Sequence, residues 1–299
     1  MWLLWILPLA ASFFLPATGK VVSSFRECSQ FFLDRKYPSL APGNPARICQ
    51  RYKNQKKGQH RFATMYDTHR HIPIFSAYIL YPYNSGQRIV DWKIEPQVKG
   101  VPILKLNIRE MESVLALPWA TARDSMESEQ TCGIAPNLLK KNQAVSSDYA
   151  HSPDYNRGHL APVSHQLDQD SKDATFTLTN IVPQFKDLNN GQWKEYEEKL
   201  KLFTTGCYRT YAIVGVVPGN IYLSNRVNIP SHIWAAVCCV LSNQGRYFWG
   251  MIAKNSENYV HFTTDLKWLE NELKVLFDNH LDFRGQKIDL FNGACYNYT

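Results

Sequence analysis

The chain has 299 residues, of which 44% are hydrophobic, and it carries a formal net charge of +7 at pH 7. This much apolar material builds one large domain with a core or at most two small ones, so global disorder is excluded. The basic charge is compatible with a polyanionic partner, but it selects none, because many extracellular proteins are basic and no block of five or more like charges occurs.

Residues 1–19 have the pattern of a secretory signal peptide. An apolar run at 2–15 is followed by small residues up to Gly19, where we expect cleavage. A membrane anchor is the alternative, but a spanning helix needs about 20 apolar residues, and Pro8 and Pro16 interrupt this run. The absence of a basic residue before the run is atypical of a signal. No later segment is long and apolar enough to span a bilayer, so we expect a secreted protein without membrane association after signal removal.

All seven cysteines follow this predicted signal, and none has the CxxC spacing of a zinc site. An oxidising compartment would pair most of them, and the odd number leaves one thiol over or joined to a second chain. The pairing and the oligomeric state cannot be read from the sequence. Because Cys238 and Cys239 alternate across a predicted strand, we expect one to face the core as a small hydrophobic residue and the other to reach a partner.

Residues 20–60 are rich in Pro, Gly, Lys and Arg, and they contain two cysteines that can close a loop. We expect a lead-in segment with little regular structure there. The β-rich runs 62–66 and 72–81 then flank a polar stretch, which predicts a hairpin. His69 and His71 lie in that stretch. They can be interpreted as metal ligands, but histidines at alternate positions in a polar turn are more often solvated.

Residues 96–155 show few periodic signals apart from a short helix predicted around 137–141. They are followed by a predicted strand at 175–183. A helix is predicted over 191–203, where apolar residues recur at helical spacing. The pattern therefore predicts a strand that leads directly into a helix.

The later part of the chain repeats strand patterns separated by turn residues, and we expect these strands to form one antiparallel sheet. They lie at 211–217, 227–240 and 247–253. An amphipathic helix is predicted over 264–277, with Thr263 or Thr264 as its N-cap. The predicted fold class is therefore α+β, with a central antiparallel sheet flanked by helices.

The tetrapeptide Asn156-Arg157-Gly158-His159 offers residues suited to phosphodiester hydrolysis. Such a reaction needs a base for the attacking water and positive charge at the phosphate oxygens. His159 is the candidate base, since imidazole titrates at about pH 6.5. Arg157 has planar donors suited to phosphate, and Gly158 allows close backbone approach. The string is short, however, and a lone histidine is usually structural, so the motif does not decide the function by itself.

Three later residues extend this candidate site. Asn189 stands where the predicted strand gives way to the helix, and its amide oxygen can ligate a hard cation. Glu197 and Lys201 follow at multiples of four residues, so the three can share one helix face. One neutral ligand with water completing the shell is typical of magnesium, with manganese as the alternative ion, and Glu197 can hold those waters. No convergent Cys/His set favours zinc.

The alternative interpretation of these three residues is structural. Asn189 would be a helix N-cap, and Glu197 with Lys201 would form an exposed ion pair. Each residue alone favours this interpretation. Their joint spacing after His159 favours the catalytic one.

Several motifs in the same order resemble the DNA/RNA non-specific endonuclease family, the ββα-metal nucleases similar to endonuclease G. The resemblance runs from about Arg61 to Ala253 and rests on 156–162, 178–184, 188–193 and 227–232. It implies a ββα-metal nuclease domain over 61–299 that cleaves DNA, and RNA as a second substrate, with little sequence preference.

The resemblance also implies roles for the candidate residues. His159 would be the general base, Asn189 the sole direct protein ligand of Mg²⁺, and Glu197 the residue that orients the ion's water. Arg157 would contact phosphate. Lys201 stands where active nucleases of the family commonly have arginine, and lysine keeps the charge but loses bidentate phosphate geometry.

The first position of the tetrapeptide departs from the family, whose motif usually begins with aspartate. Asn156 removes a negative charge beside Arg157 and the metal site. The leading hypothesis is a secreted metal-dependent endonuclease. The second is a nuclease-fold protein that has lost catalysis and binds nucleic acid, glycosaminoglycan or a protein partner. In a third, the cysteines build an interaction scaffold, which requires the spacing of His159 and Asn189 to be a coincidence.

Overall fold

The structure is a computed structural model, and it describes residues 21–43, 45–52, 59–95, 126–130 and 132–295. The predicted signal peptide lies outside the described residues, as does the 96–125 part of the region without periodic signals. The short helix predicted next to that region is confirmed as α2 (Pro136–Leu139). None of the helices in the described part of the chain combines the length and apolar content that a membrane span requires.

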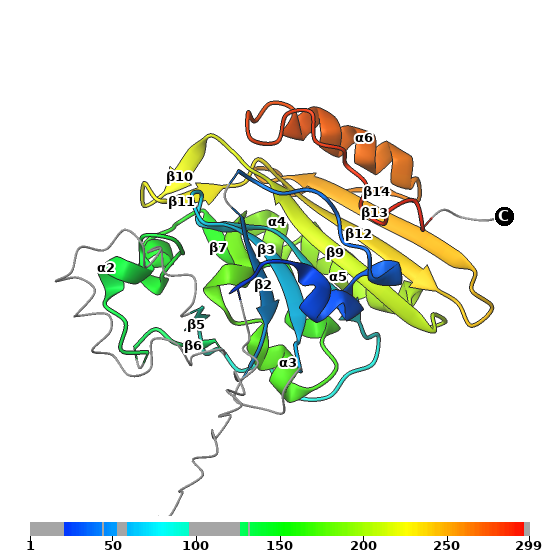
Figure 1. Cartoon of the computed structure of the whole chain (residues 1–299), viewed down its shortest axis with the longest axis horizontal. Helices are drawn as coiled ribbons and strands as arrows, with labels where there is room; N and C mark the ends of the chain where they lie inside the picture. The colour runs from blue at the N-terminus through cyan, green and yellow to red at the C-terminus, as the bar shows by residue number, and fades with distance from the viewer. Residues whose placement is uncertain (1–20, 44, 53–58, 96–125, 131, 296–299) are drawn as a thin grey trace, which may run out of the picture.

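An eight-stranded antiparallel sheet forms the centre of the molecule (Figure 1). The predicted hairpin is confirmed, because its two strands pair antiparallel, and so is the central sheet of the later strands. In spatial order the strands are β1 (Val21–Val22), β2 (Pro45–Gln50), β3 (Phe62–Asp67), β4 (Ile72–Leu80), β9 (Arg209–Val217), β12 (His232–Val240), β13 (Arg246–Lys254) and β14 (His261–Thr263).

Two further strands of the later part lie outside this sheet. β10 (Ile221–Leu223) and β11 (Val227–Ile229) pair with each other as a small separate sheet. The run predicted at 227–240 is therefore divided, and only its second part joins the central sheet as β12. Pro230 stands at the division, where it cannot donate a ladder hydrogen bond.

The segment 20–60 is more regular than expected. Strand β2 pairs with β3 along its whole length, and the 3-10 helix Phe25–Phe31 precedes it. The expectation of little regular structure was wrong because it rested on the average composition of the segment, whereas burial alternates from residue to residue over the first four positions of β2. Ile48 of β2 is buried against Tyr66 of β3. The disulfide between Cys28 and Cys49 closes the loop that the two cysteines predicted.

The two faces of the sheet carry separate cores, because side chains alternate along each strand. In β9, Val214 and Val216 belong to one core, and Ile213 and Val217 belong to the other. The first face is covered by α3 (Gln169–Ala174), α4 (Lys186–Asn190) and α5 (Gln192–Phe203), and the second by α6 (Leu266–Phe277). Figure 1 shows α6 lying along β13 and β14. The predicted α+β arrangement of helices around a sheet is confirmed.

Helix α6 occupies the predicted position, but its N-cap is Asp265, not Thr263 or Thr264. The Asp265 carboxylate accepts the N–H of Trp268 at 3.1 Å. Thr263 is the last residue of β14, and its hydroxyl accepts the N–H of Asp265 at 3.0 Å instead. The sheet therefore extends closer to the helix than the sequence pattern indicates.

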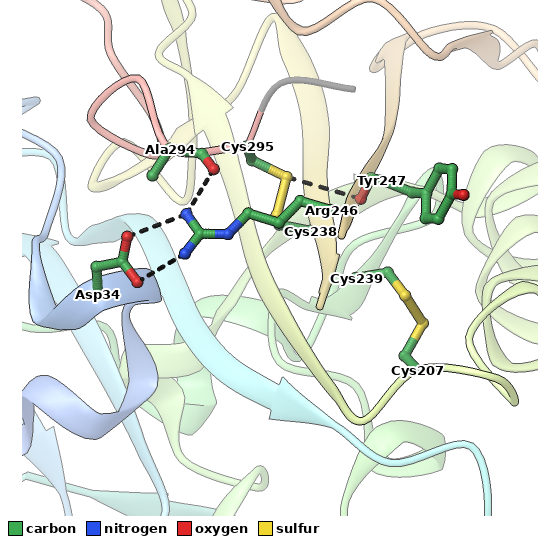
Figure 2. Close-up of a disulfide and its surroundings, with 8 residues drawn as sticks. All are labelled: Asp34, Cys207, Cys238, Cys239, Arg246, Tyr247, Ala294 and Cys295. Atoms are coloured by element: carbon green, nitrogen blue, oxygen red, sulfur yellow. Dashed lines mark hydrogen bonds and ion pairs between the residues drawn. A yellow bond between two sulfur atoms is a disulfide. The ribbon is translucent and has the colours of Figure 1, made fainter. Parts of the chain in front are cut away.

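Cys238 and Cys239 of β12 point to opposite faces, as predicted, but each of them forms a disulfide (Figure 2). Cys238 is bonded to Cys295 on the α6 face, and Cys239 is bonded to Cys207 just after α5. The expectation that one of the pair is an unbonded small core residue was wrong. A cysteine from another segment lies on each face of β12, Cys295 on one face and Cys207 on the other.

Cys132 is the cysteine that stays outside these disulfides. Its side chain is fully buried, and its thiol donates to the carbonyl oxygen of Glu129 at 3.3 Å. The cysteine left over by the odd number is therefore a buried one.

Candidate active site

Two antiparallel strands and the helices after them form the platform of the site. β7 (Tyr155–His159) pairs with β8 (Ile181–Phe185), and β8 runs into α4 and α5. The strand predicted at 175–183 starts later than expected, because a 3-10 turn precedes Ile181. The buried side chain of Asn180 fixes that turn, since it accepts the N–H of Ala161 and donates to the Ala161 carbonyl, both at 3.0 Å.

The helix predicted over 191–203 is confirmed as α5, but Asn189 does not belong to it. Asn189 lies in α4, and Gly191 separates the two helices with a non-helical backbone of φ −100° and ψ −120°. A β-carbon at Gly191 would lie 2.4 Å from the Asp187 carbonyl and from Asn258 Oδ1, so the break requires glycine. The predicted sharing of one helix face by Asn189 and Glu197 was therefore wrong. Asn189 is not the N-cap of α5 either.

The predicted site residues nevertheless converge on one cavity of about 610 Å³. Strand β7 and helices α4 and α5 supply them. They are Asn156, Arg157, His159, Asn189, Glu197 and Lys201. The break at Gly191 places Asn189 in α4, whereas Glu197 and Lys201 line the cavity from α5.

The cavity also contains residues that no sequence motif indicated. Arg88 and Trp92 come from the segment after β4, and Lys172 comes from α3. Lys172 donates to Asn84 Oδ1 at 2.8 Å and to the Gly86 carbonyl at 3.1 Å, which ties the segment that carries Arg88 to α3. The sequence offered no signal for Arg88, because a single arginine in an irregular segment is common.

His159 is held in an aromatic environment. Its ring centroid lies 5.5 Å from that of Trp92 and 5.1 Å from that of Phe176. Its Nε2 atom is buried and has no hydrogen-bond partner among the described residues. Burial, with the positive charge of Arg88, lowers the pKa of His159 to about 3. The imidazole is therefore neutral at pH 7.

Glu197 faces the cavity from α5 and accepts a hydrogen bond from the indole Nε1 of Trp193 at 3.1 Å. Burial, reinforced by the charge of Glu198, raises the pKa of Glu197 to about 8. A cation in the cavity would favour the ionised carboxylate. Lys201 pairs with Glu198 at 3.1 Å, so the exposed Glu197–Lys201 pair of the structural interpretation is not formed.

His69 and His71 do not form a metal site. His69 is exposed, and both ring nitrogens of His71 contact backbone carbonyls, of Arg226 at 3.0 Å and of Lys141 at 3.2 Å. The expectation of a solvated residue is confirmed for His69 but not for His71. Within the ranges that the structure describes, no group of three or more His, Cys, Asp or Glu residues is arranged to hold a metal ion.

Two asparagines between β13 and β14 hold the junction of β8, α4 and α5. Asn255 accepts the N–H of Phe185 at 2.8 Å and donates to the carbonyls of Pro183 and Pro230, both at 2.9 Å. Asn258 accepts the N–H of Gln192 at 2.9 Å, which caps α5 from outside the helix. Sequence reasoning missed both residues because polar residues in a turn normally indicate solvent exposure.

Replacing Asn255 by alanine is expected to lower the free energy of unfolding by about 2–4 kcal/mol, because the Phe185 N–H and two buried carbonyls lose their partners. Urea denaturation of the oxidised protein measures this loss. Asn243→Ala is the matched control, since Asn243 is an exposed turn asparagine that bonds only within its own turn, to Gly245. A similar loss in both variants would contradict a specific role for Asn255.

Comparisons with known proteins show which sequences and structures this chain resembles. A family model described as DNA/RNA non-specific endonuclease matches residues 134–294. Endonuclease domain-containing 1 protein of Homo sapiens is 29% identical over 283 residues, which are 93% of this chain and 49% of that protein. The Mus musculus protein of the same name is 29% identical over 279 residues, 91% of this chain and 48% of that protein. The chain thus spans about half the length of these two relatives.

Shorter and structural matches extend the comparison. Mitochondrial endonuclease G of Bos taurus is 36% identical over 83 residues, which are 27% of this chain and 26% of that protein. A crystal structure of the EndoG/EndoGI complex, in which EndoG is inhibited, matches with a TM-score of 0.52 at 17% identity. That match covers 84% of this chain and 90% of the other. It shows that the central sheet, with β7, β8 and the following helices, is a ββα-metal nuclease fold.

Proposed function

The chain belongs to the DNA/RNA non-specific endonuclease family, and we propose that it is a secreted metal-dependent endonuclease that hydrolyses phosphodiester bonds of DNA, and of RNA as a second substrate, with little sequence preference. The observation that carries the proposal is the convergence of His159, Asn189 and Glu197 on one cavity from three separate elements. A structural histidine or a helix cap would not require that convergence.

The donor set suits a divalent ion of the magnesium type. The amide oxygen of Asn189 would hold the ion directly, and the carboxylate of Glu197 would orient its water from α5. Zinc fits less well, since the described residues contain no cluster of three His, Cys, Asp or Glu side chains. When bound, the ion supplies positive charge for the phosphate oxygens in the transition state. Manganese fits the same oxygen donors.

The side chains of the protein supply the remaining chemistry. His159, neutral at pH 7, takes a proton from the attacking water at a ring nitrogen. Arg157, Arg88 and Lys201 line the same cavity and can contact phosphate oxygens. These groups recognise the backbone common to DNA and RNA rather than base edges, which accounts for little sequence preference.

The three disulfides support secretion, because they form and persist in oxidising compartments. The proposal is tested with purified protein secreted by eukaryotic cells, incubated with supercoiled plasmid and with RNA. We expect nicking and then degradation with Mg²⁺ or Mn²⁺, and intact substrate with EDTA. Intact substrate across all metal concentrations would overturn the proposal.

Asn156 favours a second candidate, a nuclease-fold protein with weakened catalysis that binds nucleic acid or another polyanion. It lines the cavity where the motif of the family usually has aspartate. Such a protein would show salt-sensitive binding to DNA or heparin without cleavage. A binding assay run beside the cleavage assay therefore separates the two functions.

Asn156→Asp is expected to raise the cleavage rate by about tenfold, because it restores a carboxylate beside Arg157 and the metal site. Initial rates of plasmid nicking at fixed Mg²⁺ measure the change. Asn190→Asp is the matched control, since it adds the same charge elsewhere on the cavity wall. No cleavage by either the wild type or Asn156→Asp, with retained DNA binding, would favour the binding protein.

A further inference from the structure

Trp92 contacts the two side chains of β7 that the proposed mechanism uses. Its ring centroid lies 5.5 Å from that of His159, with the planes tilted by 33°. The guanidinium carbon of Arg157 lies 5.1 Å from the same indole centroid, which is a cation–π contact. His159 and Arg157 are two residues apart on a strand, so they point to the same side, and Trp92 covers both.

Few other contacts fix these two side chains. The buried Nε2 of His159 and the buried Nε of Arg157 have no hydrogen-bond partner among the described residues. Arg157 donates through Nη2 to the Ser146 carbonyl at 3.1 Å, and its guanidinium also lies over Tyr149. No carboxylate in the described part of the chain forms an ion pair with Arg157 or His159 within 4.0 Å. Aromatic packing thus takes the place of the hydrogen bonds that commonly orient a catalytic base.

The indole is itself held firmly. Trp92 directly precedes β5 (Lys93–Ile94), and the Lys93 N–H donates to the Phe176 carbonyl at 2.8 Å. The Phe176 ring is fully buried and meets Trp92 edge to face, with centroids 5.2 Å apart. Phe176 also meets His159 edge to face. Trp92, Phe176 and His159 therefore form one cluster in which each ring contacts the other two.

We propose that Trp92 is a positioning residue, which holds the His159 imidazole and the Arg157 guanidinium in a fixed arrangement toward the scissile phosphate. This role rests on the proposed nuclease function. An imidazole without hydrogen bonds can rotate about its side-chain torsions, and the indole face restricts that rotation. A displacement of about 1 Å in a catalytic group can cost about 10²-fold in rate. Trp92 would therefore act on the chemical step rather than on substrate affinity.

Steady-state cleavage of a short fluorescent DNA duplex tests the proposal. Trp92→Leu is expected to lower kcat by about 10–100-fold while KM changes less than about twofold. Trp92→Phe keeps an aromatic face and is expected to recover most of the lost kcat. Trp249→Leu is the matched control, because Trp249 is also a partly buried tryptophan on the same core but stacks on Phe203, and it should change neither constant.

Two kinetic results would overturn the proposal. A rise in KM with unchanged kcat would mean that Trp92 stacks directly on a substrate base. An equal loss of kcat in Trp249→Leu would mean that removing either tryptophan simply loosens the core. Melting curves of the variants accompany the kinetics, and Trp92→Phe decides the outcome if Trp92→Leu does not fold.

An NMR readout keeps this test separate from the proposed function. The ring protons of His159, assigned with a His159→Gln variant, should show a shift from the indole ring current. That shift should disappear in Trp92→Leu and persist in Trp249→Leu. An unchanged His159 resonance in Trp92→Leu would refute the packing on which the proposal depends. If wild-type protein cleaves no nucleic acid, the nuclease function fails while the NMR result still decides whether Trp92 orients the imidazole.

Discussion

His159→Gln is expected to lower the rate of plasmid cleavage by about 10²–10⁴-fold, the contribution usual for a general base. Glutamine has a similar size and polarity but cannot take a proton from water at neutral pH. Initial nicking rates at saturating Mg²⁺ measure the loss. His151→Gln is the matched control, because His151 is an exposed histidine shortly before the motif, and it should leave the rate unchanged.

The pH dependence of cleavage offers a second check on His159. A base acts only in its deprotonated form, so activity is lost as the pH falls through the pKa of that base. Burial lowers the pKa of His159 to about 3, well below the ordinary value of 6.5. Protonation of His159 should therefore cause no loss of activity between pH 7 and pH 5. A wild-type acid limb centred at about pH 6.5 that disappears in His159→Gln would contradict a desolvated His159.

Asn189→Ala is expected to reduce cleavage by more than about 10²-fold at fixed Mg²⁺, which corresponds to about 2.7 kcal/mol of transition-state stabilisation. The reason is that Asn189 would be the only protein group that holds the ion directly. The matched control is Asn190→Ala, which removes the neighbouring amide from the same cavity wall. Cleavage by this control should stay close to that of the wild type.

Metal binding by the Asn189 variants is measured apart from activity. Mg²⁺ or Mn²⁺ should raise the melting temperature of the wild type by mass action, and this rise should be lost in Asn189→Ala. Asn189→Asp keeps an oxygen ligand and should retain the rise. An Asn189→Ala protein whose melting temperature responds to metal like the wild type would place the ion elsewhere in the cavity.

The sequence alone determined the local elements and the identity of the motif residues. Apolar periodicity predicted the hairpin of β3 and β4, helix α5 and helix α6, because such patterns depend on residues that are close in the chain. The sequence also indicated the chemistry available to His159 as a base, Asn189 as a metal ligand and Glu197 as a carboxylate that orients water. Each of these properties depends on the type of side chain alone. The alternation of Cys238 and Cys239 across β12 followed from strand geometry.

Only the tertiary structure decided how these parts meet. The break at Gly191 packs against Asn258, which lies 67 positions farther along the chain, so no local pattern predicted that Asn189 and Glu197, on two separate helices, would line one cavity. Trp92 and Arg88 reach the site from a distant segment, and Asn255 supports the end of β8 from another. Their positions depend on packing and hydrogen bonds between residues far apart in sequence. A sequence pattern records which face of an element is apolar, but not which residue of another element will cover it.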